Sequence, residues 1–323
     1  MPTETSPIDP FLRSLRTLLP FYGRSASADL TRLTVSENHT YRVDDGDARL
    51  VLRVHRAGYH TREEILSELD WVSALQGDAT LHTAEPLART DGERLSIVEH
   101  GGISHWVSAF SFLDGEEPVV GSHLVERFEE LGAINARLHA HAKSWSRPGN
   151  FVRKRWDFDL MFGRSPIWGD WRAAYADTTD IDLLETLENS LRDRLAAYGD
   201  GPERFGLIHG DLRVANLLDD GERLAVIDFD DCGFGWFAYD FAAAISFHED
   251  DEAIPALQAA WLRGYRTVEP FDAEDEAMLP TMIMARRLLL TAWLASRAGN
   301  DTDAVYGRGF AEGTVRLAKT YLD

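Results

Sequence analysis

Apolar and polar residues alternate along residues 30–54, and this period of two is typical of β-strands. We expect strands at LTRLTV, TYRV and ARLVLRV, with DDGD at 44–47 as the hairpin turn between the last two. Two further strands, AEPLART and RLSIVEHG, are expected on either side of Asp91-Gly92, and HWVSAFSFL follows as another strand.

A helical period interrupts these strands after Thr61, which is expected to cap a helix that runs through EEILSELDWVSALQ. Its apolar stripe is predicted to comprise Ile65, Leu66, Leu69, Val72 and Leu75. Before the first strand, residues 1–28 are interpreted as a leader with a short helix, FLRSLRTLL, bracketed by Pro10 and Pro20.

Helical periodicity dominates the rest of the chain, beyond a Gly- and Pro-containing connector near 113–118. Helices are expected at 122–142, 180–197, 238–248, 253–265 and 275–297, and short strands within 206–230. The pattern predicts an α+β protein with a leader (1–28), a small β-rich N-terminal lobe (29–113) and a larger α-helical C-terminal lobe (114–323).

Composition narrows the choice of partners. A formal net charge of −21 argues against nucleic acid and anionic membranes as partners, and fits either a solvated acidic surface or a cationic substrate.

The single cysteine, Cys232, excludes an intrachain disulfide and a Cys-based zinc cluster, and we interpret it as a small packed residue. The start, MPTETSPIDPF, lacks the features of a secretory signal, and no uninterrupted apolar run approaches about 18 residues. We therefore expect a cytoplasmic protein; its oligomeric state is not readable from the sequence.

The segment LIHGDLRVANLLDDGERLAVIDFDD carries the clearest chemistry. Asp211 is followed five residues later by Asn216 and, beyond a tight hairpin, by Asp228. A carboxylate such as Asp211 can orient an attacking hydroxyl and accept its proton, while amide and carboxylate oxygens can hold Mg²⁺ against a nucleoside triphosphate. The alternatives are a turn or cap role for Asp211 and a loop amide bonding its own backbone for Asn216.

Nucleotide binding is expected to involve the N-terminal strands. Arg53, at the end of the third strand, can pair with the α- and β-phosphates, with Glu68 holding it in place and Glu64 as the competing partner. The alternative is an exposed arginine and an exposed glutamate.

Two loops complete the expected nucleotide site. The loop containing Ser36 and Asn38 can offer N–H groups to the triphosphate, although an ordinary hairpin loop fits equally well. Residues 109–113, which include Ser111 and Leu113, can contact the adenine, pack between the lobes, or do both.

The remaining ionisable residues receive mostly structural interpretations. Asp240 is expected to favour a helix dipole, and Asp230 or Asp231 to bind a second metal or a substrate amine. We expect HEDDE at 248–252 to be a solvated acidic helix end, with the lining of a pocket for a cation as the alternative. Arg286-Arg287 is expected to form a surface ion pair rather than reach the site.

Two histidines near the middle of the chain are not expected to be catalytic. His139 and His141 lie two positions apart on a predicted helix, which does not place them on one face.

Taken together, these residues resemble the aminoglycoside phosphotransferase and choline kinase-like family, and within it the branch of bacterial stress-response kinase A and homoserine kinase type II. The segments that carry the resemblance are VLRVHRAGYHTREEILSELDWVSAL, WVSAFSFLDGEEP, LGAINARLH, LIHGDLRVANLL and VIDFDDCGFGWFAYDFAAAI. The resemblance implies a bilobal protein-kinase-like fold that binds ATP. It also implies Asp211 as the catalytic aspartate, Asn216 and Asp228 as magnesium ligands, Glu68 as the partner of the nucleotide-anchoring cation, and residues 111–113 as the adenine contact.

The chain departs from this family at one position and differs from the protein-kinase pattern at another. Arg53 stands where this fold usually has lysine, and a planar guanidinium requires a different phosphate geometry. Asp228-Phe229-Asp230 replaces the DFG of protein kinases, as is normal in the small-molecule branch, and no activation-loop segment is expected.

The expected function is ATP- and Mg²⁺-dependent transfer of the γ-phosphate to an alcohol. The acceptor is expected to be a small metabolite or amino alcohol, with a protein Ser/Thr side chain and an antibiotic as alternatives. Arg53 keeps open a different class, a nucleotide-binding pseudokinase without catalysis. A hydrolase is disfavoured because the chain has no nucleophile elbow.

Overall fold

Two compact units make up the protein, and each is described by itself. The computed structural model describes residues 10–35, 38–78, 80–118, 124–176, 179–297 and 301–323. Unit 1 comprises Met1–Glu116, Arg147–Val152 and Leu218–Asp230, and unit 2 comprises Glu117–Ser146, Arg153–Leu217 and Asp231–Asp323.

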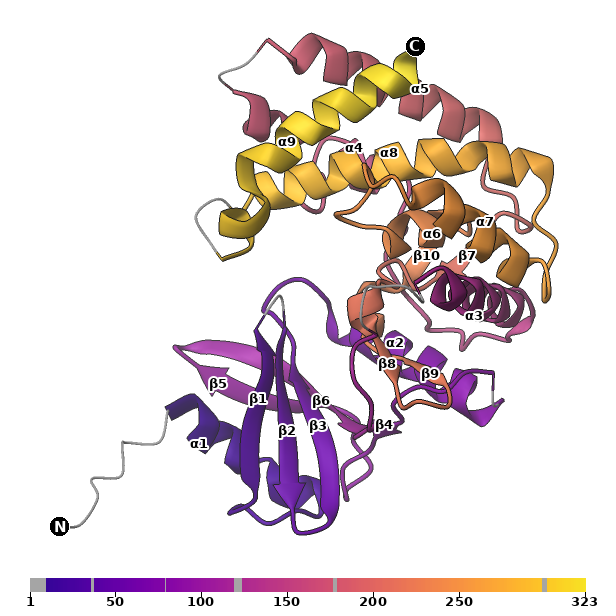
Figure 1. Cartoon of the computed structure of the whole chain (residues 1–323). Helices are drawn as coiled ribbons and strands as arrows, with labels where there is room; N and C mark the ends of the chain where they lie inside the picture. Colours follow the sequence, from indigo (N-terminus) through magenta and orange to yellow (C-terminus); the bar gives the residue numbers. More distant parts are fainter. Residues whose placement is uncertain (1–9, 36–37, 79, 119–123, 177–178, 298–300) are drawn as a thin grey trace. The chain divides into compact units, whose positions relative to one another are not determined.

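An antiparallel sheet forms the centre of unit 1 (Figure 1). Its strands are β1 (Asp29–Val35), β2 (His39–Asp45), β3 (Ala48–Val54), β4 (Pro86–Leu87), β5 (Ser96–His100) and β6 (Ile103–Ser111). They follow the order β1-β2-β3-β6-β4, and β5 pairs with β6. The predicted turn between β2 and β3 is confirmed, and its Gly46 takes the left-handed conformation that such turns require, with φ 62°.

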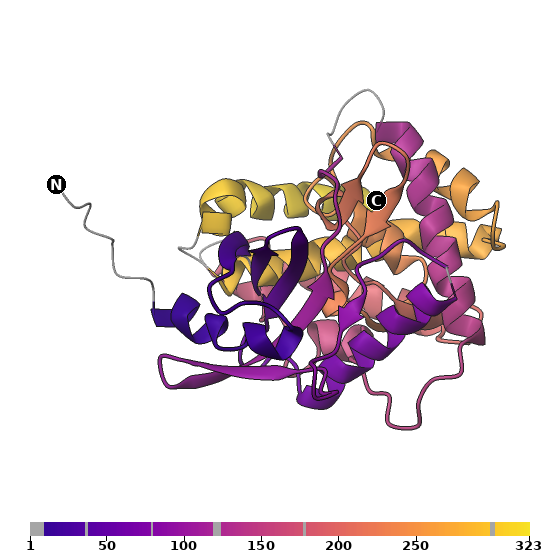
Figure 2. The same cartoon turned by 90° about the horizontal axis from the view of Figure 1, so that it is seen from below.

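Both faces of this sheet are covered by helical segments (Figure 2). On one face, Leu50 and Leu52 join the apolar cluster of α1 (Pro10–Arg16) and a short 3₁₀ helix (Leu19–Tyr22). On the other face, Val51 packs with Ile65, Leu69 and Phe110 in the cluster of α2 (Arg62–Gly77). Because side chains alternate along β3, Arg53 shares the face of Val51 and points toward α2.

The predicted start of α2 is confirmed. The Thr61 side chain accepts a hydrogen bond from Glu64 N–H, and the Glu64 side chain accepts one from Thr61 N–H, which is a capping box. The strand predicted at AEPLART is wrong in length, since only Pro86–Leu87 pairs with β6. Pro86 has no N–H to donate, which confines proline to edges and strand starts.

Helices form most of unit 2. They are α3 (Leu124–Ser144), α4 (Phe158–Phe162), α5 (Ile181–Tyr198), α6 (Tyr239–Ala244), α7 (Ile254–Tyr265), α8 (Ala273–Ala295) and α9 (Asp301–Leu322). The α3–α7 contact depends on two glycines, because a Cβ on Gly132 would lie 2.0 Å from Trp261 O and one on Gly264 1.7 Å from Glu129 O. These glycines let the two backbones approach closely at their crossing.

Two helix predictions for this unit need correction, and two of its helices, α4 and α9, were not predicted. The helix expected at 238–248 ends at Ala244, and Phe247 at φ 72° cannot continue it. The helix expected at 275–297 begins earlier, at Ala273. α9 had not been expected, because Gly307, Gly309 and Gly313 lower the helix propensity of its sequence.

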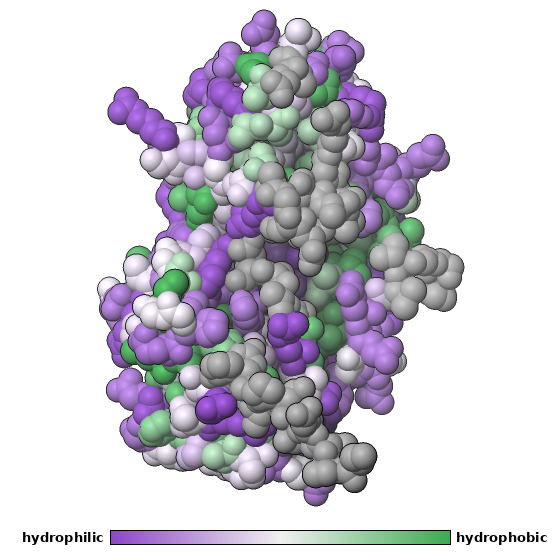
Figure 3. Space-filling view, turned by 90° about the vertical axis from the view of Figure 1, so that its left-hand side faces the viewer, coloured by the Kyte–Doolittle hydropathy of each residue, from purple (hydrophilic) through white to green (hydrophobic). Residues whose placement is uncertain are grey.

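By length and composition, α8 is apolar enough to cross a membrane. However, 78% of its most apolar window is buried inside the protein, as in a core helix. The face drawn in Figure 3 carries many hydrophilic residues, in keeping with the net charge of −21.

Short strands in and next to the segment LIHGDLRVANLLDDGERLAVIDFDD (207–231) occur in both units. In unit 2, β7 (Phe205–Ile208) pairs antiparallel with β10 (Gly233–Trp236), and β7 ends directly before His209. β8 (Leu217–Asp219), which belongs to unit 1 from Leu218 onward, pairs with β9 (Leu224–Val226), and β9 ends two residues before Asp228. Besides Leu19–Tyr22, short 3₁₀ segments lie at Trp171–Tyr175, Val214–Asn216 and Phe229–Asp231.

Candidate functional site

Asp211 lies in unit 2 at the end of the loop that follows β7. Its Oδ1 accepts a hydrogen bond from Arg286 Nη2 at 2.5 Å, and its Oδ2 accepts one from Arg213 Nε at 3.2 Å. The side chain is largely buried, with 17% of its area exposed. Burial by itself would raise the pKa of Asp211. The positive charges of Arg213 and Arg286, together with His209, lower it by more than burial raises it, so the pKa lies below its usual value. The carboxylate is therefore ionised and able to accept a proton.

Asp240, the second residue of α6, holds the loop that carries Asp211. It is fully buried, and its Oδ1 accepts Gly210 N–H at 2.9 Å while its Oδ2 accepts His209 N–H at 3.2 Å. The same Oδ2 accepts His139 Nε2 at 3.0 Å. The expected place of Asp240 in the first helical turn is confirmed, yet its bonds to the Asp211 loop were not anticipated.

Asn216 lies beside Asp211, as the spacing of the motif predicted. Its Nδ2 donates to Asp211 O at 2.7 Å and to Asp211 Oδ2 at 3.1 Å. These bonds use the nitrogen of the amide and orient its Oδ1 away from Asp211. An amide oxygen fixed in this way is a suitable ligand for a hard cation.

Arg53 lies buried in unit 1 and pairs with Glu68, as expected; the competing Glu64 instead caps α2. Its Nη1 also lies 3.1 Å from Asp228 Oδ1, and its guanidinium lies 4.9 Å from the ring centroid of Phe110. Burial by itself would lower the pKa of Arg53, but Glu68, Asp230 and Asp228 raise it above its usual value. The arginine is a fixed cation in the described structure.

Asp228 follows β9 in unit 1 with a backbone φ of 61°, an uncommon conformation for a residue other than glycine. Its side chain is 45% exposed. Strained backbone of this kind is concentrated at functional sites, because the surrounding structure must maintain it. The carboxylate is thus held near Arg53 and remains open to solvent.

Two histidines in unit 1 face the neighbouring Asp230, which is buried. His55 Nδ1 lies 3.4 Å and His60 Nε2 lies 3.6 Å from Asp230 Oδ1. Burial by itself would raise the pKa of Asp230, yet these histidines and Arg53 lower it well below its usual value. This environment stabilises a buried carboxylate and lends no support to a substrate amine at Asp230.

The other predicted nucleotide contacts are placed as follows. Ser36 lies outside the described residues. Asn38 is buried, and its Oδ1 accepts Arg56 N–H at 3.0 Å. Ser111 ends β6, where its N–H donates to Glu85 O and its hydroxyl accepts Glu85 N–H, each at 2.8 Å. Leu113 is half-buried just beyond β6.

The surface ion pair expected of Arg286 and Arg287 is wrong, since both side chains are buried in unit 2. Arg286 binds Asp211, while Arg287 Nη1 donates to Glu249 Oε2 at 2.6 Å. Within 248–252 only Glu249 is buried; the other four residues are exposed, as expected for a solvated acidic segment, although they lie beyond the end of α6. Sequence alone offered one signal: two arginines within an apolar helical stretch need buried partners.

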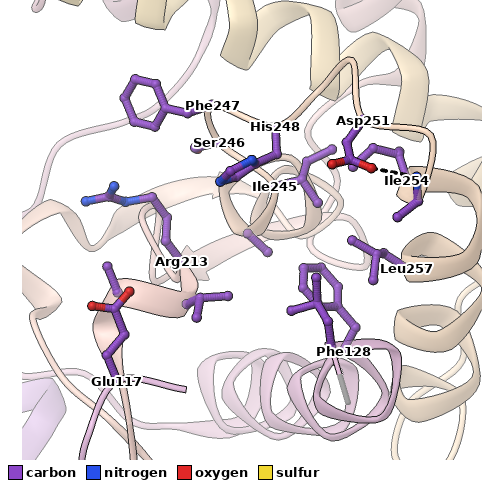
Figure 4. A pocket seen from close by; sticks show the side chains of 15 residues that line it. Glu117, Phe128, Arg213, Ile245, Ser246, Phe247, His248, Asp251, Ile254 and Leu257 are labelled. Atoms are coloured by element: carbon purple, nitrogen blue, oxygen red, sulfur yellow. Dashed lines mark hydrogen bonds between the residues drawn. The ribbon is translucent and has the colours of Figure 1, made fainter. Parts of the chain in front are cut away.

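A pocket of about 190 Å³ opens within unit 2 (Figure 4). Its lining residues are Glu117, Leu124, Phe128, Arg213, Val214, Ala215, Ala244, Ile245, Ser246, Phe247, His248, Asp251, Ala253, Ile254 and Leu257. Phe128, Ile254 and Leu257 contribute apolar surface, whereas Glu117 and Asp251 contribute acidic groups. Arg213 lines the pocket and is also bonded to Asp211, so the pocket adjoins the candidate base.

Comparison with known proteins gives this geometry a context. The model of the family described as "Phosphotransferase enzyme family" matches residues 29–271. A homoserine kinase of Neisseria meningitidis is 29% identical over 254 residues, covering 76% of this chain and 75% of its own.

Solved structures extend the comparison over nearly the whole chain. The structure of a microcompartment-associated aminopropanol kinase is 41% identical, with a TM-score of 0.89, covering 95% of this chain and 96% of its own. An amicoumacin kinase solved in complex with AMP-PNP, Ca²⁺ and Ami is 19% identical, with a TM-score of 0.71, covering 89% of this chain and 88% of its own. These likenesses confirm the predicted protein-kinase-like fold, with a β-rich N-terminal and a helical C-terminal region.

Proposed function

Because the chain belongs to the phosphotransferase enzyme family, we propose that it transfers the γ-phosphoryl group of ATP, with Mg²⁺, to the hydroxyl of a small amino alcohol. The observation that carries this proposal is the arrangement at Asp211. An ionised carboxylate, held by Arg286, Arg213 and Asn216, adjoins a small pocket with acidic residues on its wall. The family establishes a kinase, and the acceptor and cofactors are the proposed part.

Asp211 is proposed as the catalytic base. It orients the acceptor hydroxyl and takes its proton as the oxygen forms a bond to the γ-phosphorus. The bond between that phosphorus and the β–γ bridging oxygen breaks, and the electron pair leaves with ADP. Asp211 remains ionised for this role because Arg213, Arg286 and His209 keep its pKa below the usual value despite burial.

Asn216 and Asp228 are proposed as ligands of the divalent cation. Both fit, because each offers an oxygen of the hard type that Mg²⁺ prefers. The amide nitrogen of Asn216 is committed to Asp211, which orients Oδ1 for a cation, and Asp228 is 45% exposed. The bound cation would neutralise charge on the phosphates. The amicoumacin kinase solved with AMP-PNP and Ca²⁺ supports nucleotide and divalent-cation use in this fold.

Arg53, anchored by Glu68, is proposed to bind the α- and β-phosphates in place of the usual lysine. Its pairing with Glu68 and its packing over Phe110 fix the guanidinium and so lower the cost of orienting it. We propose that Leu113 and the carbonyl of Ser111 contact the adenine ring of ATP, since the Ser111 N–H is already bonded to Glu85. Asn38 and Ser36 complete the proposed nucleotide contacts.

The proposed acceptor follows from the pocket. A volume of about 190 Å³ is small beside the roughly 300–1,000 Å³ that hold drug-sized ligands, which favours a compact acceptor over an antibiotic or a polypeptide. Glu117 and Asp251 offer carboxylates to an ammonium group, while Phe128 and Leu257 accommodate a short carbon chain. The aminopropanol kinase, at 41% identity, supports the same class of acceptor. We further propose a cytoplasmic location.

A labelling experiment tests this function. The purified protein is incubated with γ-labelled ATP, Mg²⁺ and one acceptor at a time: aminopropanol, ethanolamine, homoserine, neutral propane-1,2-diol or a protein mixture. We expect transfer to an amino alcohol, dependence on the divalent cation, and a rate about 10²–10⁴-fold lower in Asp211→Asn. Nucleotide binding without transfer to any acceptor would support a module without catalysis, and labelling of protein alone would support a Ser/Thr kinase.

A further inference from the structure

We propose that Arg286, on α8, is a positioning residue that fixes the Asp211 carboxylate for phosphoryl transfer. The inference rests on the proposed role of Asp211 as the base and extends it to a residue 75 positions away in the chain. Arg286 does not touch the acceptor; it acts through Asp211.

The contacts of Arg286 define the position of Asp211 from two sides. Its Nη2 donates to Asp211 Oδ1 at 2.5 Å, and its Nη1 donates to the main-chain Gly210 O at 3.3 Å. One rigid guanidinium thus holds the side chain of the base and the backbone that carries it. Arg286 holds Oδ1 and Asn216 Nδ2 holds Oδ2 at 3.1 Å, so the partly exposed Arg213 is the contact that an acceptor hydroxyl can replace.

The other contacts hold Arg286 itself. Its Nε donates to Ser246 Oγ at 2.9 Å, and its Nη1 lies 3.3 Å from Tyr239 OH. The side chain is almost fully buried, with 1% of its area exposed. A planar guanidinium bonded on several edges has little freedom to move, so it can position a carboxylate more precisely than a flexible ammonium.

Stability alone is a poor reason for this pair. A buried ion pair is often no more stabilising than well-packed apolar residues of similar volume, because both charges lose their hydration. Arg213 differs from Arg286, since its side chain is 34% exposed and also lines the acceptor pocket. The buried arginine is therefore the fixed contact of Asp211, and Arg213 is the one that an acceptor can displace.

Arg287 provides a matched control on the same helix. It is equally buried, but it binds Glu249, Thr314 Oγ1 and Phe310 O rather than the Asp211 loop. Substitutions of Arg287 therefore reproduce the loss of a buried arginine without removing a contact of Asp211.

The experiment compares Arg286→Lys and Arg286→Met with Arg287→Lys and Arg287→Met. For each folded variant, kcat, KM for ATP and acceptor, the pH profile of kcat and the thermal midpoint are measured. We expect both Arg286 variants to lose about 10²-fold in kcat, the cost of a base misplaced by about 1 Å, with KM changed less than about threefold. The acidic limb of the kcat profile should move to higher pH in Arg286→Met, and Arg286→Lys should recover it in part.

The Arg287 variants should lower the thermal midpoint but leave kcat per folded molecule within about threefold of the parent protein. Equal kcat losses in the Arg286 and Arg287 series, or full kcat in folded Arg286→Met, would overturn the inference. Asp211→Asn separates the two hypotheses: its full activity would refute the proposed base, whereas an inactive Asp211→Asn beside a fully active Arg286→Met would refute only the positioning role.

Discussion

Asp240 Oδ1 accepts the main-chain N–H of Gly210 at 2.9 Å, so that a buried carboxylate on α6 determines the path of the loop that ends in Asp211. The second oxygen of Asp240 accepts His209 N–H and His139 Nε2. Asp240 therefore satisfies main-chain donors that would otherwise be buried without a partner.

Removing this carboxylate should destabilise unit 2. We expect Asp240→Ala to lower the free energy of unfolding by about 3 kcal/mol or more, because each buried donor left without a partner costs about 1–3 kcal/mol. Chemical denaturation measures the change. Asp200→Ala is the control, since it removes only an exposed partner of Arg155 and should cost less than about 1 kcal/mol. Equal effects of the two substitutions would contradict the prediction.

The proposed phosphate contact of Arg53 can be tested against another arginine of β3. We expect Arg53→Met to lower kcat/KM for ATP by about 10- to 100-fold, because charge-assisted hydrogen bonds contribute about 1.5–3 kcal/mol. Arg53→Lys should retain an intermediate value, since the charge remains but the planar fork is lost. The control is Arg49→Met, which removes an exposed pair with Asp114 and should leave kcat/KM for ATP unchanged. Unaltered ATP kinetics in a folded Arg53→Met would exclude the contact.

The acidic wall of the pocket predicts a preference for amines. We expect Asp251→Asn, with and without Glu117→Gln, to raise KM for an amino alcohol by about tenfold while leaving KM for ATP unchanged. Asparagine can still accept the Ala253 N–H that Asp251 accepts at 2.8 Å, so α7 should keep its start. Asp250→Asn removes a neighbouring charge that does not line the pocket and should leave acceptor kinetics unchanged. The idea fails if all three variants alter KM alike.

His139 predicts part of the pH dependence of stability. Burial lowers its pKa below the ordinary 6.5, although Asp240 acts in the opposite direction. In the unfolded chain the histidine takes up a proton near pH 6.5, whereas in the folded protein it stays neutral to lower pH. Its contribution is therefore complete above pH 6.5 and falls by up to about 1.4 kcal/mol per pH unit below it.

Urea denaturation of the parent protein and His139→Gln between pH 5 and pH 8 measures this contribution. Glutamine can still donate to Asp240 but does not titrate in this range. We expect the variant to lose less stability than the parent protein on acidification. Parallel pH profiles would show that another group accounts for the slope.

Local sequence was sufficient for much of the N-terminal region. The alternation along β3, the turn at Gly46 and the capping box of Thr61 all follow from interactions within a few residues, and each agrees with the structure. The motif spacing also predicted that Asn216 lies beside Asp211, because a separation of five positions and a short 3₁₀ turn bring the two together.

What the sequence by itself determined was the order of the elements and the residue types available for chemistry. Tertiary structure decided which charges became buried partners: Arg286 with Asp211, Asp240 with the Gly210 loop, and Arg287 with Glu249. These partners lie between 30 and 75 positions apart in the chain. Helical periodicity shows which side chains share a face but not which distant group that face will meet. From the sequence alone, an arginine on α8 is therefore expected at the surface. In the folded protein packing buries it, and a buried charge needs a carboxylate beside it.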